Sequence, residues 1–165
     1  NPIEQEGTYP LPEAQLDRFM FNIYLSYPSF ADELQIVKNT TSNHDVELKK
    51  VIDAKQIQYF QKLVRNIPVA DNVVEYAVKL ASKTRPNTQL ATEEINKYIS
   101  WGAGPRASQF LVIGAKCHAA ISGKYSPDIE DVQAVAEAIL RHRIVRNYRA
   151  EAEGLTVEQL IRNLF

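Results

Sequence analysis

The chain has 165 residues, which corresponds to one domain or to one domain with a short appendage. With 45% hydrophobic and 24% charged residues, its composition argues against disordered, collagen-like and membrane proteins. The 19 basic and 20 acidic side chains leave a net charge of −1, so no overall field attracts nucleic acid or anionic lipid, and such a partner would need a local patch.

The N-terminal segment is irregular at first and then extended. Residues 1–12 contain four Pro or Gly residues, and Glu13–Arg18 is predicted to form one polar helical turn. In Phe19–Leu25 every second side chain is Phe, Ile or Leu, which predicts a strand with one apolar face. A single strand has no partner for its backbone amides and carbonyls, so this one must pair with strands outside the sequence or fold back on the rest of the chain.

The start of the chain suggests a piece of a longer protein. The first residue is Asn1, the only methionine is Met20, and no signal-peptide pattern is present. We therefore expect an excised or processed piece, with part of a functional site lying upstream.

From residue 28 onward the apolar pattern has a helical period, and start signals mark each helix. Ser29 suits the N-cap of a helix over Ala31–Thr41, and Pro105 suits the first position of a long central helix that reaches Ile121. The other expected starts are a capping box at Asp53 and Gln56, caps at Asp71 and Thr92, Ser126-Pro127, and a second box at Thr156 and Gln159.

These patterns predict a mainly α fold. It is a helical bundle of five or more helices, preceded by a short strand-containing stub. The helix behind Asp71 is expected to turn Val74, Ala77, Val78 and Ala81 inward. The helix behind Thr92 is expected to reach Gly102.

The apolar run, the cysteine and the histidines argue against membrane-spanning, disulfide-bonded and zinc-binding proteins. The apolar run Phe110–Ala115 is far shorter than the roughly 20 residues of a membrane-spanning helix. The only cysteine, Cys117, has no partner for an internal disulfide and fits a reducing compartment, so we expect a cytoplasmic protein. The three histidines lack partners at zinc-ligand spacing.

Three stretches of the sequence carry a family resemblance. The opening run from Asn1 to Phe19, NPIEQEGTYPLPEAQLDRF, resembles the segment that follows the fourth core strand of MoxR-type AAA+ ATPases. Gly104–Ser108, GPRAS, resembles the family's sensor 2 motif at the start of a lid helix. Ile129–Ile144 resembles its final lid segment, and the order and spacing of the three stretches also fit.

The resemblance implies two domains and an incomplete nucleotide site. Residues 1–27 would be the C-terminal remnant of an α/β nucleotide-binding core, and residues 28–165 the helical lid domain. The phosphate loop Gly-x-x-x-x-Gly-Lys-Ser/Thr and the strand-end acidic pair for magnesium are absent from the sequence. The intact parent is therefore expected to bind ATP and Mg²⁺, whereas this fragment alone is expected to bind neither and to hydrolyse no ATP.

The resemblance assigns roles to three residues. Asn1 matches sensor 1, whose amide orients the attacking water or touches the γ-phosphate. Arg18 matches the arginine finger, which acts in trans because its permanent charge can enter a neighbouring subunit's site. Arg106 matches sensor 2, which contacts an ATP phosphate at a helix start that already favours anions.

Each of these residues also has an ordinary structural interpretation. Asn1 is then a loop asparagine before proline. Arg18 is then half of a surface ion pair with Asp17 or Glu13, which contributes little to stability. Arg106 is then a solvated first-turn residue, slightly disfavoured by the helix dipole.

The family resemblance also implies an activity and a set of partners. An ATPase of this kind couples ATP binding and hydrolysis to chaperone-like remodelling of client proteins or to metal insertion into them. It is expected to form a ring, usually a hexamer, and to work with a client or a von Willebrand A-domain protein. A membrane partner is not expected, and neither is nucleic acid.

A rival interpretation is a non-enzymatic helical interaction module. The segment Arg141–Arg149 holds four arginines in nine residues, with His142 and Tyr148 interleaved, as a nucleic-acid patch would. Such a run more often solvates a helix end or contacts a partner subunit. The rival explains the missing phosphate loop directly, but it gives no reason for the resemblance of residues 1–19 and 104–108.

Overall fold

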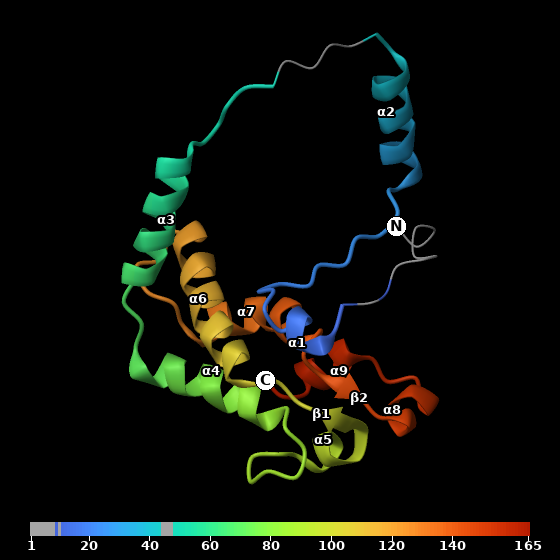
Figure 1. The fold of residues 1–165 in the computed structure, drawn as a ribbon, viewed down its shortest axis with the longest axis vertical. Coiled ribbons are helices and arrows are strands. Elements are labelled where there is room, and N and C mark those ends of the chain that lie inside the picture. The colour runs from blue at the N-terminus through green and yellow to red at the C-terminus, as the bar shows by residue number, and fades with distance from the viewer. Residues whose placement is uncertain (1–8, 10, 44–47) are drawn as a thin grey trace. The chain divides into compact units, whose positions relative to one another are not determined.

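The computed structural model describes residues 9, 11–43 and 48–165. Within them the chain is mainly helical, as its periodicity predicts, and a pair of short strands completes the fold (Figure 1). The helices are α1 (Glu13–Leu16), α2 (Phe30–Thr41), α3 (Ala54–Asn66), α4 (Asp71–Lys83), α5 (Glu93–Tyr98), α6 (Pro105–Ile121), α7 (Ile129–Leu140), α8 (Tyr148–Ala152) and α9 (Val157–Arg162). The strands are β1 (Ile99–Trp101) and β2 (Val145–Arg146).

The chain divides into two compact units. One contains the described residues up to Asn22 together with Leu63–Phe165, and the other contains Ile23–Lys62. The expected division into residues 1–27 and 28–165 rests on the domain boundary of the family that the sequence resembles, not on contacts within the chain. It stays a prediction.

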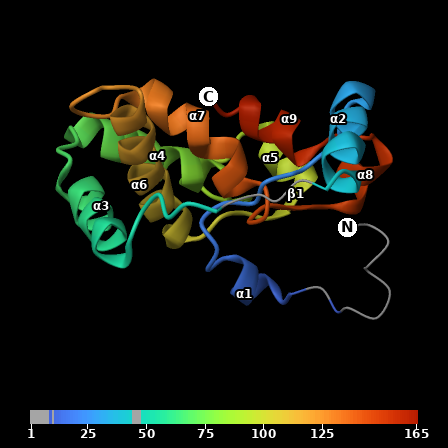
Figure 2. The same ribbon diagram turned by 90° about the horizontal axis from the view of Figure 1, so that it is seen from above.

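The core of the larger unit is built around α4, α6 and α7 and extends to residues of α5, α8 and α9. Figures 1 and 2 show α6 and α7 side by side, and Leu111 of α6 and Ile139 of α7 are fully buried there. At Gly114 a Cβ atom would lie only 3.1 Å from Val135 Cγ2 and 3.2 Å from Ile139 Cδ1. The absence of a side chain therefore lets the two helices approach closely.

The two strands join the middle of this unit to its C-terminal part. They pair antiparallel, with Ile99 opposite Arg146 and Trp101 opposite Val145. The helix that starts behind Thr92 was expected to reach Gly102, but it ends at Tyr98 because Ile99 already has extended backbone angles. Its last predicted residues form β1 instead.

The strand predicted over Phe19–Leu25 is wrong, because no ladder partner lies beside this segment in the described residues. Part of the segment folds back on the bundle. Asn22 N–H donates to the Ala138 carbonyl at 2.8 Å, and Met20 Cε lies 3.4 Å from the position of a Cβ on Gly114. This part of the backbone therefore pairs with the bundle instead of with a second strand.

Most helix starts agree with the predicted caps. The Ser29 side chain accepts a hydrogen bond from Asp32 N–H, Thr92 accepts one from Ile95 N–H, and Pro105 is the first residue of α6. The boxes at Asp53 and Thr156 also form.

Two predicted starts are wrong. Helix α4 has Ala70 at its N-cap, and Asp71 is its first residue, where a negative charge favours the helix dipole. The buried face is shifted accordingly, since Val73 is buried and Val78 is 46% exposed. Helix α7 begins after Asp128, whose capping box with Asp131 satisfies the helix start two residues beyond Ser126.

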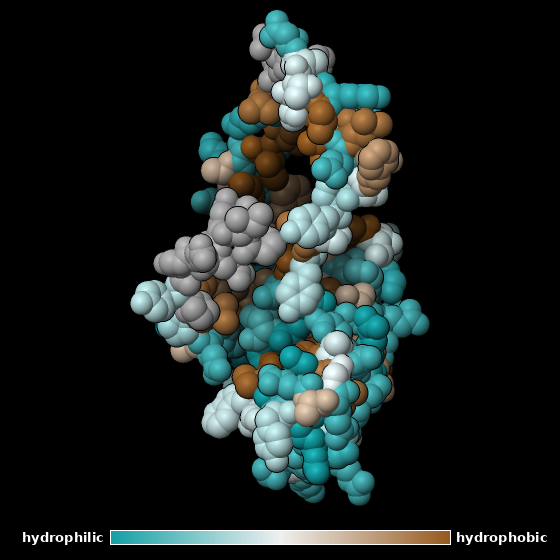
Figure 3. All heavy atoms as spheres, turned by 90° about the vertical axis from the view of Figure 1, so that its right-hand side faces the viewer, coloured by the Kyte–Doolittle hydropathy of each residue, from teal (hydrophilic) through white to brown (hydrophobic). Residues whose placement is uncertain are grey.

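The smaller unit contains α2 and most of α3, and neither helix contains a buried residue. Phe30, Leu34 and Val37 of α2 form an apolar hollow of about 270 Å³ with Glu33 at its edge. The space-filling view of Figure 3 shows apolar side chains open to solvent. Among the described residues, no helix combines the length and apolar character that crossing a membrane requires.

Candidate functional site

Arg106 lies in the first turn of α6, the longest helix in the described part of the chain. The N-cap of this helix is Gly104, which offers no side-chain hydrogen bond, and Pro105 occupies the first position. The helix start therefore leaves backbone N–H groups without a side-chain cap, and the helix dipole adds partial positive charge. A guanidinium at this place completes a group of donors suited to an anion.

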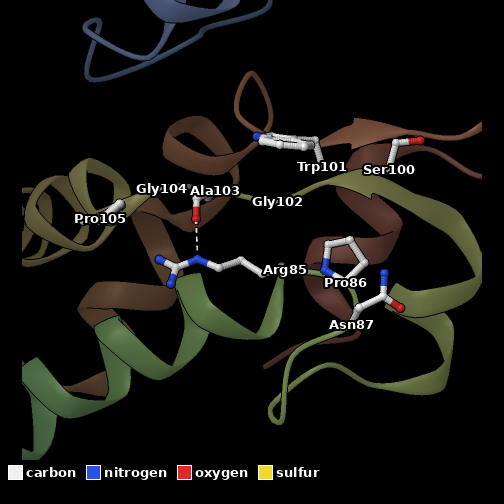
Figure 4. Close-up of a pocket in the computed structure, with 9 residues that line it drawn as sticks. All are labelled: Arg85, Pro86, Asn87, Ser100, Trp101, Gly102, Ala103, Gly104 and Pro105. Carbon is white, nitrogen blue, oxygen red and sulfur yellow. Dashed lines mark hydrogen bonds between the residues drawn. The ribbon is translucent and has the colours of Figure 1, made fainter.

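The segment before α6 is fixed by the end of α4. The buried Thr84 hydroxyl donates to the Ala81 carbonyl at 2.6 Å and accepts from Ala103 N–H at 2.9 Å. Arg85 Nε donates to the Ala103 carbonyl at 2.8 Å, as Figure 4 shows. At Gly102 a Cβ would lie 2.3 Å from the Thr84 carbonyl oxygen, so only glycine fits this approach.

Asp17, just after α1, connects this helix start to the N-terminal segment. Its Oδ2 lies 2.5 Å from Arg106 Nη1, and its Oδ1 lies 2.9 Å from Arg143 Nε. The Asp17 side chain is 31% exposed and that of Arg106 is 42% exposed, whereas that of Arg143 is only 1% exposed. One carboxylate therefore joins a partly exposed arginine to a buried one.

Arg143 is surrounded by backbone carbonyls. Its Nη2 donates to the Asp17 carbonyl at 2.7 Å and to the Phe19 carbonyl at 2.6 Å. Its Nη1 donates to the carbonyls of Met20, at 3.4 Å, and of Ile139. The guanidinium carbon lies 5.1 Å from the centroid of the Phe110 ring. Burial lowers the pKa of Arg143 and the Asp17 carboxylate opposes this effect, so the side chain keeps its charge.

Two pockets flank this region. One, of about 360 Å³, is lined by Asp17, Arg143 and His142 among others. The other, of about 480 Å³, lies on the side of Arg85 and Pro86 (Figure 4). Trp101, which is 70% exposed, lines both.

His142 lines the smaller of these two pockets together with the charged groups Glu13, Asp17 and Arg143. Its Nε2 lies 3.1 Å from the Phe19 carbonyl oxygen. Burial, followed by the positive charge of Arg143, lowers the pKa of His142 from its ordinary value. The ring is therefore neutral at pH 7 and donates from Nε2 to the carbonyl.

The structure places the predicted site residues unequally. Asn1 lies outside the described residues. Arg18 is exposed in the turn after α1, and its side chain forms no ion pair with Asp17 or Glu13, the two partners that its structural interpretation requires. Arg106 is brought together with Asp17 and Arg143.

The roles of Asp17, Arg143 and Thr84 are not visible in the sequence. There Asp17 stands only as a candidate partner for its neighbour Arg18, and Arg143 only as one charge in a basic run. The two share an ion pair across 126 positions, which no local pattern can indicate. Thr84 carried no signal beyond a position just ahead of Arg85-Pro86.

The arginines of the segment Arg141–Arg149 contact their own chain. Arg141 Nε lies 3.3 Å from Glu158 Oε1, Arg146 Nη1 donates to the Leu155 carbonyl at 2.6 Å, and Arg149 Nε lies 4.0 Å from a Glu153 carboxylate oxygen. With the Arg143 contacts, each of the four arginines has a contact within the chain, and the Arg149 side chain stays 56% exposed. They give no support to a nucleic-acid patch.

A second polar cluster joins α6 to the start of α7. The fully buried Asp131 lies 2.6 Å from His118 Nδ1 and 3.1 Å from Lys124 Nζ. Burial alone would raise the pKa of Asp131, but hydrogen bonds from the Asp128 backbone, His118 and Lys124 lower it to about 2. This cluster fixes a helix start, and no group of three or more potential metal ligands occurs in the part of the chain that the structure describes.

Family models and known proteins match this chain along most of its length. Residues 91–164 match the AAA lid domain, and residues 1–21 match the ATPase family associated with various cellular activities (AAA). An uncharacterized protein YeaC of Bacillus subtilis is 36% identical over 99% of the chain, and the chaperone MoxR1 of Mycobacterium tuberculosis is 35% identical over 98%. Protein MoxR of Methylorubrum extorquens is 27% identical over 87%.

A solved structure has the same fold. A crystal structure from Cytophaga hutchinsonii, described as that of a candidate ATPase, superimposes with a TM-score of 0.89 and 35% identity over 99% of this chain and 50% of its own. The chain covers 49% of the Bacillus relative, 42% of the Mycobacterium relative and 45% of the Methylorubrum relative. It therefore spans about half the length of the proteins that it matches.

Proposed function

Because this chain belongs to the MoxR-type AAA+ ATPases, we propose that it supplies the helical lid and the arginine finger of such an enzyme. ATP and Mg²⁺ are bound by the phosphate loop and the strand-end acidic pair of the whole protein, both of which this sequence lacks. The whole protein is a cytoplasmic ATPase that couples hydrolysis to chaperone-like remodelling of clients or to metal insertion. It works as a ring, in our proposal a hexamer, with a client or a von Willebrand A-domain protein as its partner.

The observation that supports this proposal best is the place of Arg106. It lies at a helix start without a side-chain cap, and its guanidinium has one contact, Nη1 with Asp17, in the described part of the chain. Nε and Nη2 keep N–H groups for a second acceptor. Arg106 is therefore suited to contact a terminal phosphate held by the core domain of its own subunit, as sensor 2 does.

Arg18 has the properties that a trans-acting residue requires. It is exposed, it lies in a turn rather than within a long helix, and Asp17 is occupied by two other arginines. A permanently charged fork in this place can reach an ATP molecule bound by the neighbouring subunit. Asn1 remains the candidate for sensor 1.

The test is Arg18→Ala in the whole ATPase. A finger stabilises charge that develops in the transition state, so kcat should fall by about 10³-fold or more while ATP binding changes by less than about threefold. Steady-state hydrolysis and equilibrium nucleotide binding measure the two effects. Arg149→Ala is the matched control, because Arg149 is also an exposed arginine and its one ion pair, with Glu153, is long.

Mixed rings test the trans assignment. Arg18→Ala subunits keep an intact nucleotide site, whereas subunits with a defective phosphate loop keep an intact finger. Rings that contain both should recover part of the hydrolysis. If no activity returns although mixed assembly is shown by mass, Arg18 does not act in trans.

A further inference from the structure

We propose that Arg143 is the positioning residue of the arginine finger, and that it fixes the turn that presents Arg18. This inference rests on the finger role proposed above. Arg143 touches neither ATP nor the reacting atoms in this proposal. It acts through the backbone on both sides of Arg18.

The hydrogen bonds of Arg143 surround one residue. Its Nη2 donates to the carbonyls of Asp17 and Phe19, which are the two neighbours of Arg18 in the chain. Its Nη1 donates to the Met20 carbonyl, one residue further on. A single guanidinium therefore fixes three of the four carbonyls from Asp17 to Met20, while the Arg18 side chain stays exposed.

The remaining contacts anchor the same guanidinium to the lid. Nη1 also donates to the Ile139 carbonyl near the end of α7, and the Phe110 ring of α6 lies beneath the guanidinium. With Asp17 Oδ1 on Nε, the five acceptors equal the five N–H groups of an arginine. The turn that carries Arg18 is thus joined to the two central lid helices.

The burial of the Arg143 charge requires that all its hydrogen-bond donors have acceptors. The Arg143 side chain is 1% exposed, and a buried charge is tolerated only when its donors are satisfied. A lysine keeps the charge but has three donors on one nitrogen and no planar fork. It is able to retain the Asp17 ion pair but not the carbonyls on both sides of Arg18.

The arrangement also relates the finger to sensor 2. Asp17 contacts Arg143 with one oxygen and Arg106 with the other. Through these contacts a movement of α6 would be transmitted to the turn that carries Arg18. The lid of one subunit is linked by this route to the nucleotide site of its neighbour.

The decisive variant is Arg143→Lys in the whole ATPase. We expect kcat to fall by about tenfold or more, because the finger turn loses its carbonyl contacts, while KM for ATP changes by less than about twofold. Arg149→Lys, at a position whose side chain is 56% exposed, is the matched control and should leave both values unchanged. Circular dichroism and thermal unfolding establish that each variant is folded.

Mixed rings separate positioning of the finger from a defect in the subunit's own site. Arg143→Lys subunits should regain hydrolysis when combined with subunits that have a defective phosphate loop, as Arg18→Ala subunits do. Asp17→Asn is the second variant, in case Arg143→Lys does not fold, because it removes the ion pair at a partly exposed position and keeps the main-chain carbonyl. It should lower kcat by about threefold or more and should also recover in mixed rings.

The outcomes distinguish this inference from the function on which it rests. If Arg18→Ala leaves hydrolysis unchanged, the finger role itself is wrong. If Arg18→Ala behaves as a trans-acting finger but Arg143→Lys hydrolyses ATP normally, or loses activity that mixed rings do not recover, the positioning role of Arg143 is overturned. If Arg143→Lys does not fold, Asp17→Asn decides. The positioning role is overturned if Asp17→Asn hydrolyses ATP normally, or if its lost hydrolysis does not return in mixed rings.

Discussion

The guanidinium of Arg106 contacts a protein carboxylate with one nitrogen, and its other N–H groups are left for a second acceptor. Asp17 Oδ2 contacts Nη1 and orients the side chain, and in the proposed sensor 2 role this would lower the entropy lost when a phosphate binds to the remaining donors. The interaction is partly exposed, with Arg106 at 42% and Asp17 at 31%, so solvent screens it and it holds Arg106 only moderately. Arg106 is therefore oriented without being immobilised.

We predict that Arg106→Ala in the whole ATPase weakens ATP binding by about tenfold, the equivalent of one charge-assisted hydrogen bond, and weakens ADP binding much less. Arg106→Lys should restore only part of the affinity, because an ammonium cannot fork across two phosphate oxygens. Calorimetry at matched salt measures both nucleotides. Equal affinities of the Arg106→Ala variant and the parent for ATP and ADP would make Arg106 an ordinary first-turn residue.

Asp131 gives a prediction about stability against pH. Its pKa is about 2 in the folded chain, below the ordinary value of 3.8, so the folded state favours the ionised form. The stabilisation is complete above pH 4 and is lost as the pH falls through about 2; the shift corresponds to about 2 kcal/mol. Asp131→Asn should therefore destabilise the chain at pH 7, and its deficit should shrink between pH 4 and pH 2.

Urea unfolding of this chain at a series of pH values measures the effect. Glu130→Gln is the matched control, because Glu130 lies in the same helical turn but is exposed. A deficit for Asp131→Asn that stays constant down to pH 2 would show that packing, and not ionisation, accounts for the loss.

At the scale of elements, the connection between α4 and α6 depends on one buried hydroxyl. Thr84 satisfies both the Ala81 carbonyl and the Ala103 N–H, two residues before Pro105 begins α6. The hydroxyl therefore links the end of one core helix to the start of the helix that carries Arg106.

Thr84→Val removes the hydroxyl and keeps the shape of the side chain. It should lower the free energy of unfolding by about 1 to 3 kcal/mol, because the Ala103 N–H is left buried without an acceptor. Thr84→Ser keeps the hydroxyl and should cost much less. Thermal unfolding of the two variants compares them, and equal losses would show that the hydroxyl hydrogen bonds do not account for the effect.

The helices could be predicted from the sequence where their starts are local. A capping box at Asp53 or Thr156 involves residues three positions apart, so its pattern is visible in the chain itself. The starts of α4 and α7 differ from the prediction, because α4 begins behind Ala70, which has no capping side chain, and α7 begins behind Asp128, two residues beyond Ser126. The strands β1 and β2 were missed because they are short and depend on each other.

The candidate site was predictable only where a motif marks it. Arg18 and Arg106 stand in stretches that resemble the family, so their positions were expected. Asp17 and Arg143 became visible only when the fold brought together residues far apart in the chain. Tertiary contacts of this kind leave no periodic trace in a single sequence.

At the scale of the whole molecule, the two units differ in how they are stabilised. Every residue of the described hydrophobic core lies between Val73 and Leu164, in the larger unit. Helices α2 and α3 contain 12 and 13 residues and no buried side chain. Helices of this length are marginal in water by themselves, so their caps carry much of their stability.

The long reach of the Arg143 contacts has a consequence for how the chain folds. Helices α6 and α7 are neighbours in sequence and pack early at small entropic cost, whereas Asp17 and Arg143 close a loop of 126 positions. Interactions that form after the folding transition state slow unfolding without speeding folding. In stopped-flow urea experiments on this chain, Asp17→Ala should therefore raise the unfolding rate and leave the folding rate nearly unchanged. Leu111→Ala, in the core between α6 and α7, should slow folding. If both substitutions slow folding to a comparable extent, the N-terminal segment docks within the folding nucleus.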